Sequence, residues 1–352
     1  MAPDDAAAIC RDLGETITIH PYRIDMVRDR LLLLRLTLEQ MNGAAFLDQR
    51  VQEGKPPGAW LAWEQVSAIM AGRQPGAAAH YLFHVGHCGS TLVSRLLGEL
   101  GVTALREPLP LRTLAETHMG LDAPESRWSR PTFDTRLTLL TSLFDRGAGP
   151  RAVKATSFCS DLAIPILASH GDRRATVVFT ALRPYLANVL AGPASRVELQ
   201  TMAPMRHRRL RTHVGDGIAP LHGMSPGQVA AMSWMTEMTA LAAVPDVIDP
   251  GRLAYLDFDR FLVDAGPQLR RLADHVQPGI PDEQLFAAVS GSTMTRYSKA
   301  PEHAYDARLR QEVLADGERR FGDEIRSGLA WCERVADRSP AVARALAVSG
   351  HA

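Results

Sequence analysis

YLFHVGHCGSTLVSRLL, residues 81–97, joins a short apolar strand, a loop with two glycines and the first turns of a helix. The strand is the apolar run of residues 81–85, and the loop is GHCGST, residues 86–91. Beyond the loop, apolar side chains recur with the spacing of one helix face: Leu92, Val93, Leu96, Leu97 and Leu100. A glycine-bearing loop between a strand and a helix is typical of phosphate-binding sites, because it points backbone N–H groups at the ligand.

This loop supplies donors for one oxyanion. Gly86 and Gly89 leave the backbone N–H groups accessible, and the hydroxyls of Ser90 and Thr91 add two donors. The helix dipole contributes roughly half a positive charge at the same point. A nucleoside triphosphatase loop has a longer span and a lysine before its Ser or Thr, and this loop has neither. The pattern favours a single anionic group over a triphosphate chain, with an ordinary glycine turn as the alternative.

Further strand patterns alternate with helical patterns along the rest of the chain. We expect strands at residues 151–158 (RAVKATSF), 175–182 (ATVVFTAL) and 252–258 (RLAYLDF), and helices within residues 136–146, 233–244 and 261–276. This alternation predicts an α/β fold with a central, mainly parallel sheet and helices on both faces. Ligands of such sheets bind outside the carboxyl ends of the strands, which is where the loop lies.

The two ends of the chain differ from this central part. Residues 30–38 (RLLLLRLTL) predict a strand or a short helix, and residues 59–72 (AWLAWEQVSAIMAG) predict a helix. Residues 73–80 (RQPGAAAH) have the composition of a linker. We therefore expect a small N-terminal extension, residues 1–76, and an α/β domain, residues 77–352. The charged stretch after Tyr305 predicts an amphipathic C-terminal helix packed on the core.

Composition excludes several function classes. Hydrophobic residues make up 46% of the chain, charged residues make up 22%, and the formal net charge is +0. These are ordinary values for a soluble protein without the basic field of a nucleic-acid binder. Four scattered cysteines without a CxxC pair indicate no zinc site and a reducing compartment. No apolar run approaches the roughly 20 residues of a membrane span, and the N-terminus does not have the pattern of a secretion signal. We expect a cytoplasmic protein.

The order of these segments resembles the sulfotransferase family. The strand, the short loop with G-[ST]-T and the helix are similar to the family's 5′-phosphosulfate-binding segment. VVFTALRPYLANVL, residues 177–190, is similar to a family strand that ends in an arginine holding the donor's 3′-phosphate. Residues 252–276 and RYSKAPEH, residues 296–303, are similar to later segments of bacterial members. The resemblance spans residues 81–336. It implies a P-loop NTPase-like three-layer fold and 3′-phosphoadenosine-5′-phosphosulfate as the sulfuryl donor.

The resemblance also implies roles for loop residues. It places the donor's phosphosulfate on residues 86–91, that is on Gly86, His87, Cys88, Gly89, Ser90 and Thr91. His87 stands where the family usually has a lysine or arginine, and a histidine is fully charged only when its environment favours protonation. We therefore expect Lys154, at the end of a strand, to supply the cation that stabilises the leaving group. The alternative is that Lys154 is a surface lysine.

For the donor's 3′-phosphate, the resemblance implies Arg183, whose planar fork can bind phosphate bidentately. The family has a serine eight residues later, where this chain has Ala191, and Asn188 or Ser195 could substitute for it. Arg296 and Lys299 could close over the nucleotide. The basic run of residues 205–213 could contribute to binding, although a run of this kind is more often a solvated helix face.

Sulfuryl transfer needs a base to take the acceptor's proton. Glu107 is our candidate, because it follows the loop at a spacing similar to that of the catalytic glutamate in protein-tyrosine sulfotransferases; the alternative is a surface carboxylate paired with Arg106 or Arg112. His84 and His118 are weaker candidates. We expect Asp257 and Asp259 to cap or anchor the following helix, and we expect no metal.

The sequence therefore predicts a sulfotransferase that acts on a hydroxyl of a small-molecule or glycan acceptor. Two alternatives stay open. One is a P-loop kinase or NTPase with a degenerate loop, and the other is a catalytically inactive sulfotransferase-like binding protein. His87 and Ala191 are the features that favour the second alternative.

Overall fold

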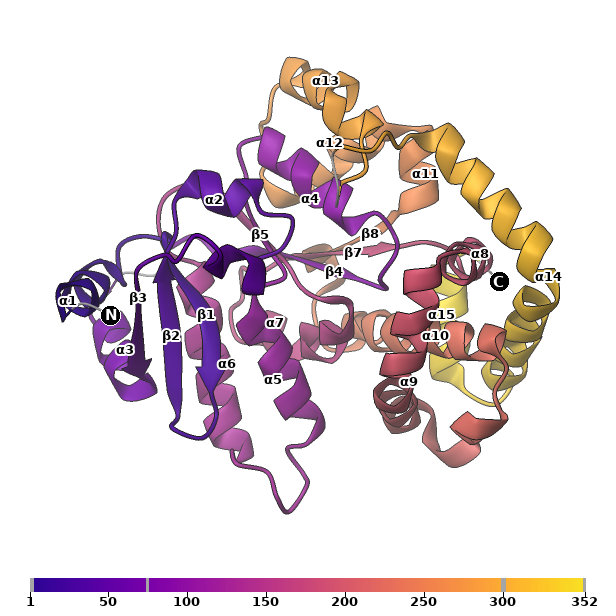
Figure 1. Ribbon diagram of the computed structural model, residues 1–352, viewed down its shortest axis with the longest axis horizontal. Coiled ribbons are helices and arrows are strands. Elements are labelled where there is room, and N and C mark those ends of the chain that lie inside the picture. The colour runs from indigo at the N-terminus through magenta and orange to yellow at the C-terminus, as the bar shows by residue number, and fades with distance from the viewer. Residues whose placement is uncertain (1–2, 74–75, 299–301, 351–352) are drawn as a thin grey trace.

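A parallel five-stranded sheet forms the centre of the fold, as seen in a computed structural model that describes residues 3–73, 76–298 and 302–350 (Figure 1). Its strand order is β5-β6-β4-β7-β8, so the strand before the glycine loop lies in the middle. The bounds are β4 (His80–His84), β5 (Thr103–Arg106), β6 (Arg151–Lys154), β7 (Ala175–Phe179) and β8 (Leu253–Asp257). All neighbouring pairs are parallel, which confirms the predicted α/β class with a central parallel sheet.

Helices cover both faces of this sheet. Figure 1 shows α4 and α12 on one side and α5, α6 and α7 on the other, which makes the predicted three layers. The bounds of these and the neighbouring helices are α4 (Ser90–Glu99), α5 (Leu109–Met119), α6 (Arg130–Phe144), α7 (Ala163–Ala168), α11 (Phe258–Val263), α12 (Ala265–Val276) and α13 (Asp282–Ser290). Strands between two helical layers are buried on both faces, which explains the continuous apolar runs of β4 and β7.

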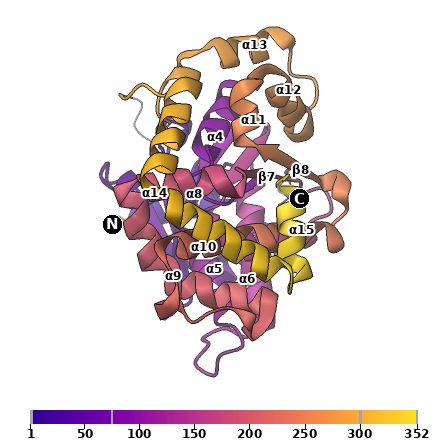
Figure 2. The same ribbon diagram turned by 90° about the vertical axis from the view of Figure 1, so that its right-hand side faces the viewer.

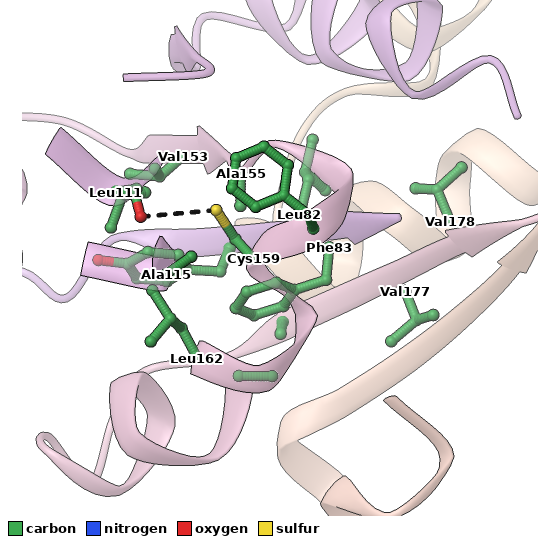
Figure 3. Packing of buried hydrophobic residues seen from close by; sticks show 14 of the residues in the cluster. Leu82, Phe83, Leu111, Ala115, Val153, Ala155, Cys159, Leu162, Val177 and Val178 are labelled. Carbon is green, nitrogen blue, oxygen red and sulfur yellow. Dashed lines mark hydrogen bonds between the residues drawn. The ribbon is translucent and has the colours of Figure 1, made fainter. Parts of the chain in front are cut away.

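The core beneath the sheet is closely packed (Figure 3). Phe83 of β4 and Val177 of β7 pack there together with Leu111 of α5. Cys159 lies in the 3-10 segment η2 (Ser157–Leu162), and its thiol donates a hydrogen bond to the Leu111 carbonyl at 3.6 Å. Burial raises the pKa of this thiol, so Cys159 acts as a small apolar core residue.

The N-terminal region forms a separate antiparallel sheet in the order β1-β2-β3. Its elements are α1 (Pro3–Asp12), β1 (Ile19–Asp25), β2 (Arg30–Arg35), α2 (Leu38–Gly43), β3 (Gly58–Ala62) and α3 (Trp63–Ala71). The leucine-rich run is thus a strand. The expectation of a helix over residues 59–72 is wrong for residues 59–62, because this segment pairs with β2, with Leu31 opposite Leu61. Strand pairing in the tertiary structure outweighs local helical spacing here.

A further group of helices comes from segments both before and after β8. It contains α8 (Leu182–Ala191), α9 (Pro193–Val214), α10 (Pro226–Ala242), α14 (Ala307–Ala336) and α15 (Pro340–Val348). Figure 2 shows α14 running across α8 and α10, and all three pack together. The crossing is close, because a Cβ at Gly317 of α14 would overlap the Ala187 carbonyl of α8. Among the helices of the described residues, none has the length and apolarity that crossing a membrane requires.

Candidate active site

One cavity of about 440 Å³ lies at the carboxyl edge of the parallel sheet, lined by residues at or after the ends of β4, β5, β6 and β8. The loop after β4 lies in its middle, Glu107 follows β5, and Lys154 ends β6. Phe258, which follows β8, lines the opposite side. The predicted position of the site, at the carboxyl edge of the sheet beside the glycine loop, therefore coincides with a cavity.

The loop between β4 and α4 has a backbone that few residues adopt. Gly86, His87 and Gly89 have φ values of 80°, 51° and 71°. Gly89 is also pressed against the ring of Phe258, which a Cβ would overlap. Four described non-glycine residues have positive φ. Two of them, His87 and Glu107 (φ 54°), line this cavity. Strained backbone of this kind concentrates at functional sites.

The start of α4 has the properties of an anion site. The first N–H groups of a helix have no partner within it, and the helix dipole favours negative charge there. Ser90 and Thr91 are buried and line the cavity. The Thr91 hydroxyl has no hydrogen-bond partner among the described residues. A buried hydroxyl without a partner costs free energy, and an oxyanion held at the helix start would supply that partner.

Glu107 and Lys154 form an ion pair at the side of the cavity. The side chain of Lys154 is 1% exposed and that of Glu107 is 21% exposed. The two residues are adjacent in the sheet, where the Glu107 N–H donates to the Lys154 carbonyl at 2.7 Å. Lys154 is therefore buried beside the anion loop, and the alternative of a surface lysine is wrong.

The alternative partners of Glu107 are engaged elsewhere. Arg106 is buried and donates to the Ser94 hydroxyl at 3.1 Å, and Arg112 donates to Glu116 at 3.1 Å. Burial lowers the pKa of Arg106 to about 10. Arg106 also donates to the backbone carbonyls of residues 42 and 44, which joins the N-terminal region to β5. Through this junction Phe46 reaches the cavity, with its ring 5.4 Å from the Lys154 ammonium.

His87 contacts α8 and α9. Its carbonyl accepts a hydrogen bond from Asn188 at 3.2 Å, and its ring nitrogens lie 3.4 Å from the Ser195 hydroxyl and 3.8 Å from a Glu198 carboxylate oxygen. Burial opposes ionisation of Glu198, yet contact with His87 and the charge of Arg206 together lower the pKa of this carboxyl to about 2. The imidazole is thus held by α9 beside an anionic group.

The basic run of residues 205–213 is not a fully solvated face. Arg206 and Arg209 are buried. Arg206 pairs with Glu198 at 2.7 Å, and Arg209 pairs with Glu237 at 2.7 Å and with Asp161 at 2.6 Å. The interpretation as a solvated face is wrong for these two positions, because both side chains are buried and paired with carboxylates.

The described residues that line this cavity do not include Arg183 or Arg296. The Arg183 side chain is 51% exposed and pairs with Glu318 of α14 at 3.2 Å. Arg296 forms an isolated antiparallel bridge with Ala304. Lys299, also predicted near the nucleotide, lies outside the described residues. Of the weaker base candidates, His84 lines the cavity and accepts a hydrogen bond from the Gly86 N–H at 3.0 Å, whereas His118 lies outside it.

Arg310 of α14 is a further cavity residue, which the sequence patterns do not indicate. This guanidinium lines the cavity although the side chain is 2% exposed, and its Nε donates to Asp259 at 3.0 Å. Asp259 also accepts a hydrogen bond from the Thr180 hydroxyl, which follows β7. Asp257 caps α11 by accepting from the Asp259 N–H at 2.9 Å, so the expectation that these aspartates cap and anchor the helix is confirmed. Nothing local in the charged run around Arg310 distinguishes it from its solvated neighbours.

No family model and no curated protein sequence matches the chain. Three solved structures similar to it are sulfotransferases, the family named by the sequence resemblance. The sulfotransferase domain from the curacin biosynthetic pathway is 16% identical, with 70% of this chain and 92% of that chain covered and a TM-score of 0.39. Sulfotransferase STF9 from Mycobacterium avium is 11% identical, with 91% and 96% covered and a TM-score of 0.40. Sulfotransferase STF1 from Mycobacterium tuberculosis H37Rv is 14% identical, with 90% and 93% covered and a TM-score of 0.36.

Proposed function

We propose that the protein is a sulfotransferase that moves a sulfuryl group from 3′-phosphoadenosine-5′-phosphosulfate to a hydroxyl of a small-molecule or glycan acceptor. One observation carries the proposal. The start of α4, with its buried and unpartnered Thr91 hydroxyl, lies in the same cavity as the Glu107–Lys154 ion pair. An anion-binding group and a carboxylate that can take a proton are the two parts that this transfer needs.

The donor's phosphosulfate fits the groups around the loop. Residues 87–91 offer backbone N–H groups and the Ser90 and Thr91 hydroxyls, whereas the Gly86 N–H already donates to His84. Lys154 adds a positive charge at the side of the same cavity. These groups complement one doubly charged phosphosulfate. A triphosphate chain would also need the loop lysine, which this sequence does not have.

The reaction assigns a role to each member of the ion pair. The acceptor oxygen attacks the sulfur in line, the bond between sulfur and the bridging oxygen breaks, and the electron pair leaves with the nucleotide phosphate. Glu107 takes the proton of the acceptor hydroxyl. Lys154 faces the negative charge that develops on the leaving phosphate, and the loop N–H groups stabilise the same charge without reorganising. His87, held by Ser195 and Glu198, orients the loop.

The proposal is tested with labelled donor and purified protein. Transfer of ³⁵S from 3′-phosphoadenosine-5′-phosphosulfate is measured over a panel of phenols, alcohols and glycans, in parallel with magnesium-dependent ATP hydrolysis. We expect transfer to at least one acceptor and tight binding of 3′,5′-adenosine bisphosphate by titration calorimetry. Binding of ATP but not of the bisphosphate would favour the kinase or NTPase alternative. Bisphosphate binding without transfer to any acceptor would favour the inactive binding protein.

A further inference from the structure

We infer that Arg310, and not Arg183, holds the second phosphate of the nucleotide, the one on its ribose. This inference rests on the proposed function and assigns the end of the donor that lies away from the reacting sulfur. It differs from what the sequence resemblance implies for Arg183.

The strand order determines the direction in which the donor lies. The anion loop follows the central strand β4, with β6 and β5 on one side and β7 and β8 on the other. Glu107 and Lys154 belong to the β5–β6 side. The transferring sulfur must face Glu107, because the attacking hydroxyl gives its proton there. The rest of the nucleotide therefore extends from the loop toward the β7–β8 side.

Arg310 is the guanidinium that lines the cavity on that side. It lies beside Phe258, with its central carbon 5.9 Å from the centre of that ring. A guanidinium has five N–H donors, and Asp259 accepts from two of its nitrogens, at 3.0 and 3.4 Å. Asp259 does not belong to the cavity lining, so the carboxylate holds Arg310 from behind. Arg310 also donates to the Tyr305 hydroxyl, which leaves two of its five N–H donors for a ligand.

Burial makes this site effective for phosphate. Arg310 is 2% exposed, so its interaction with a phosphate would be little screened by solvent. Tyr305 lines the same side, where its hydroxyl accepts a hydrogen bond from Arg310, and burial raises the pKa of the phenol, so its own O–H proton can be donated to a ligand. The fork of arginine matches phosphate oxygens in geometry as well as in charge.

Arg183 has a different environment. Its side chain is half exposed and already paired with Glu318. Glu318 lies eight residues after Arg310 on α14, about 12 Å along the helix axis. The close contact of Gly317 with Ala187 also lies on this stretch, so the Arg183 pair sits at the α8–α14 crossing. An exposed ion pair of this kind is worth little free energy, and Arg183 is absent from the described residues that line the cavity.

The test combines a change in the protein with a change in the ligand. Calorimetry measures the affinities of the wild type, Arg310→Gln and the matched control Arg183→Gln for 3′,5′-adenosine bisphosphate and adenosine 5′-phosphate, which differ only in the second phosphate. We expect the wild type and Arg183→Gln to prefer the bisphosphate by roughly 10-fold or more. We expect Arg310→Gln to bind both nucleotides equally, while its affinity for adenosine 5′-phosphate stays near that of the wild type.

Other results would overturn the inference. If Arg183→Gln loses the preference and Arg310→Gln keeps it, Arg183 holds the second phosphate. If Arg310→Gln weakens both nucleotides equally, Arg310 acts on their shared part or on the fold. Should Arg310→Gln fail to fold, Arg310→Lys is the second variant, because it keeps the positive charge and loses the planar guanidinium. We expect Arg310→Lys to reduce the preference for the bisphosphate over adenosine 5′-phosphate. A wild type that binds neither nucleotide would overturn the proposed function itself, which separates the two failures.

Discussion

The two sides of the cavity each contain an ion pair, but the pairs face it differently. On the β5–β6 side, Lys154 and Glu107 both line the cavity. On the β7–β8 side, Arg310 lines the cavity but its partner Asp259 does not. Asp259 lies behind Arg310 and also accepts a hydrogen bond from the Thr180 hydroxyl. The carboxylate of the first pair can therefore receive a proton from a ligand, whereas that of the second can only orient its cation. In the proposed function, this difference assigns the chemistry to one side and binding to the other.

The largest effect is expected at Glu107. Glu107→Gln keeps the shape of the side chain but cannot accept a proton, so we expect kcat to fall roughly 10²- to 10⁴-fold. Affinity for 3′,5′-adenosine bisphosphate should change little, because the loop that binds the phosphate is intact. Steady-state transfer rates and calorimetry measure the two quantities.

Asp259→Asn is the matched control for this comparison of the two sides. It loosens Arg310 and leaves Glu107 in place, so it should weaken nucleotide binding more than it lowers kcat at saturating donor. If Asp259→Asn lowers kcat as much as Glu107→Gln does, the division into a reacting side and a binding side is wrong.

The next prediction concerns the free energy of unfolding and the two glycines of the loop between β4 and α4. Both glycines have positive φ, and Gly89 lies against Phe258. A Cβ at Gly86 would meet only Ser157, at an ordinary contact distance of 3.5 Å. Alanine at either position carries a backbone cost of about 1 kcal/mol, and Gly89→Ala adds an overlap worth about 1–3 kcal/mol. Urea unfolding of both variants measures the difference.

The contact with Phe258 can be isolated in a double variant. Phe258→Ala removes the ring that a Cβ at position 89 would overlap, so the added cost of Gly89→Ala should largely disappear in that background. Equal costs of the two alanine substitutions in the wild-type background would show that Phe258 does not press on the loop.

The local parts of this arrangement could be predicted from the sequence. Apolar periodicity located β4, β6, β7 and β8, and the glycines located the anion loop, because these signals depend on neighbouring residues. Lys154 follows from its place at the end of a predicted strand, since strand ends share the carboxyl edge of the sheet, whereas Glu107 was predicted from its spacing in the family resemblance. Strand β5 was missed, because Thr103–Arg106 has only four residues and no clear alternation.

Long-range packing determined what the sequence could not predict. Arg310 reaches the cavity only because α14 folds back across α8, and the charged composition of α14 conceals one buried arginine among exposed ones. Residues 59–62 are a strand because β2 lies beside them. The ion pair between Arg183 and Glu318 likewise joins two distant helices. Each outcome depends on a partner far along the chain, which local patterns do not contain.

A smaller effect is expected in the centre of the cavity. Thr91→Val replaces the buried hydroxyl with a methyl group of the same size, so the fold should be kept and one hydrogen bond to the donor phosphate lost. We expect affinity for 3′,5′-adenosine bisphosphate to fall about 10-fold. Thr91→Ser restores the hydroxyl and should restore most of the affinity. Unchanged affinity in Thr91→Val would mean that the phosphate is bound elsewhere in the cavity.

The smallest effect tests whether the N-terminal region belongs to the reacting side. Phe46 places its ring 5.4 Å from the Lys154 ammonium and 4.6 Å from the Arg50 guanidinium, so it contributes a cation–π contact next to Glu107. Phe46→Ala should lower kcat/KM for the acceptor about 3-fold and leave bisphosphate affinity unchanged, whereas Phe46→Tyr keeps the ring and should stay near the wild type. If Phe46→Ala instead weakens the bisphosphate, the donor extends toward β5, and the orientation inferred from the strand order is reversed.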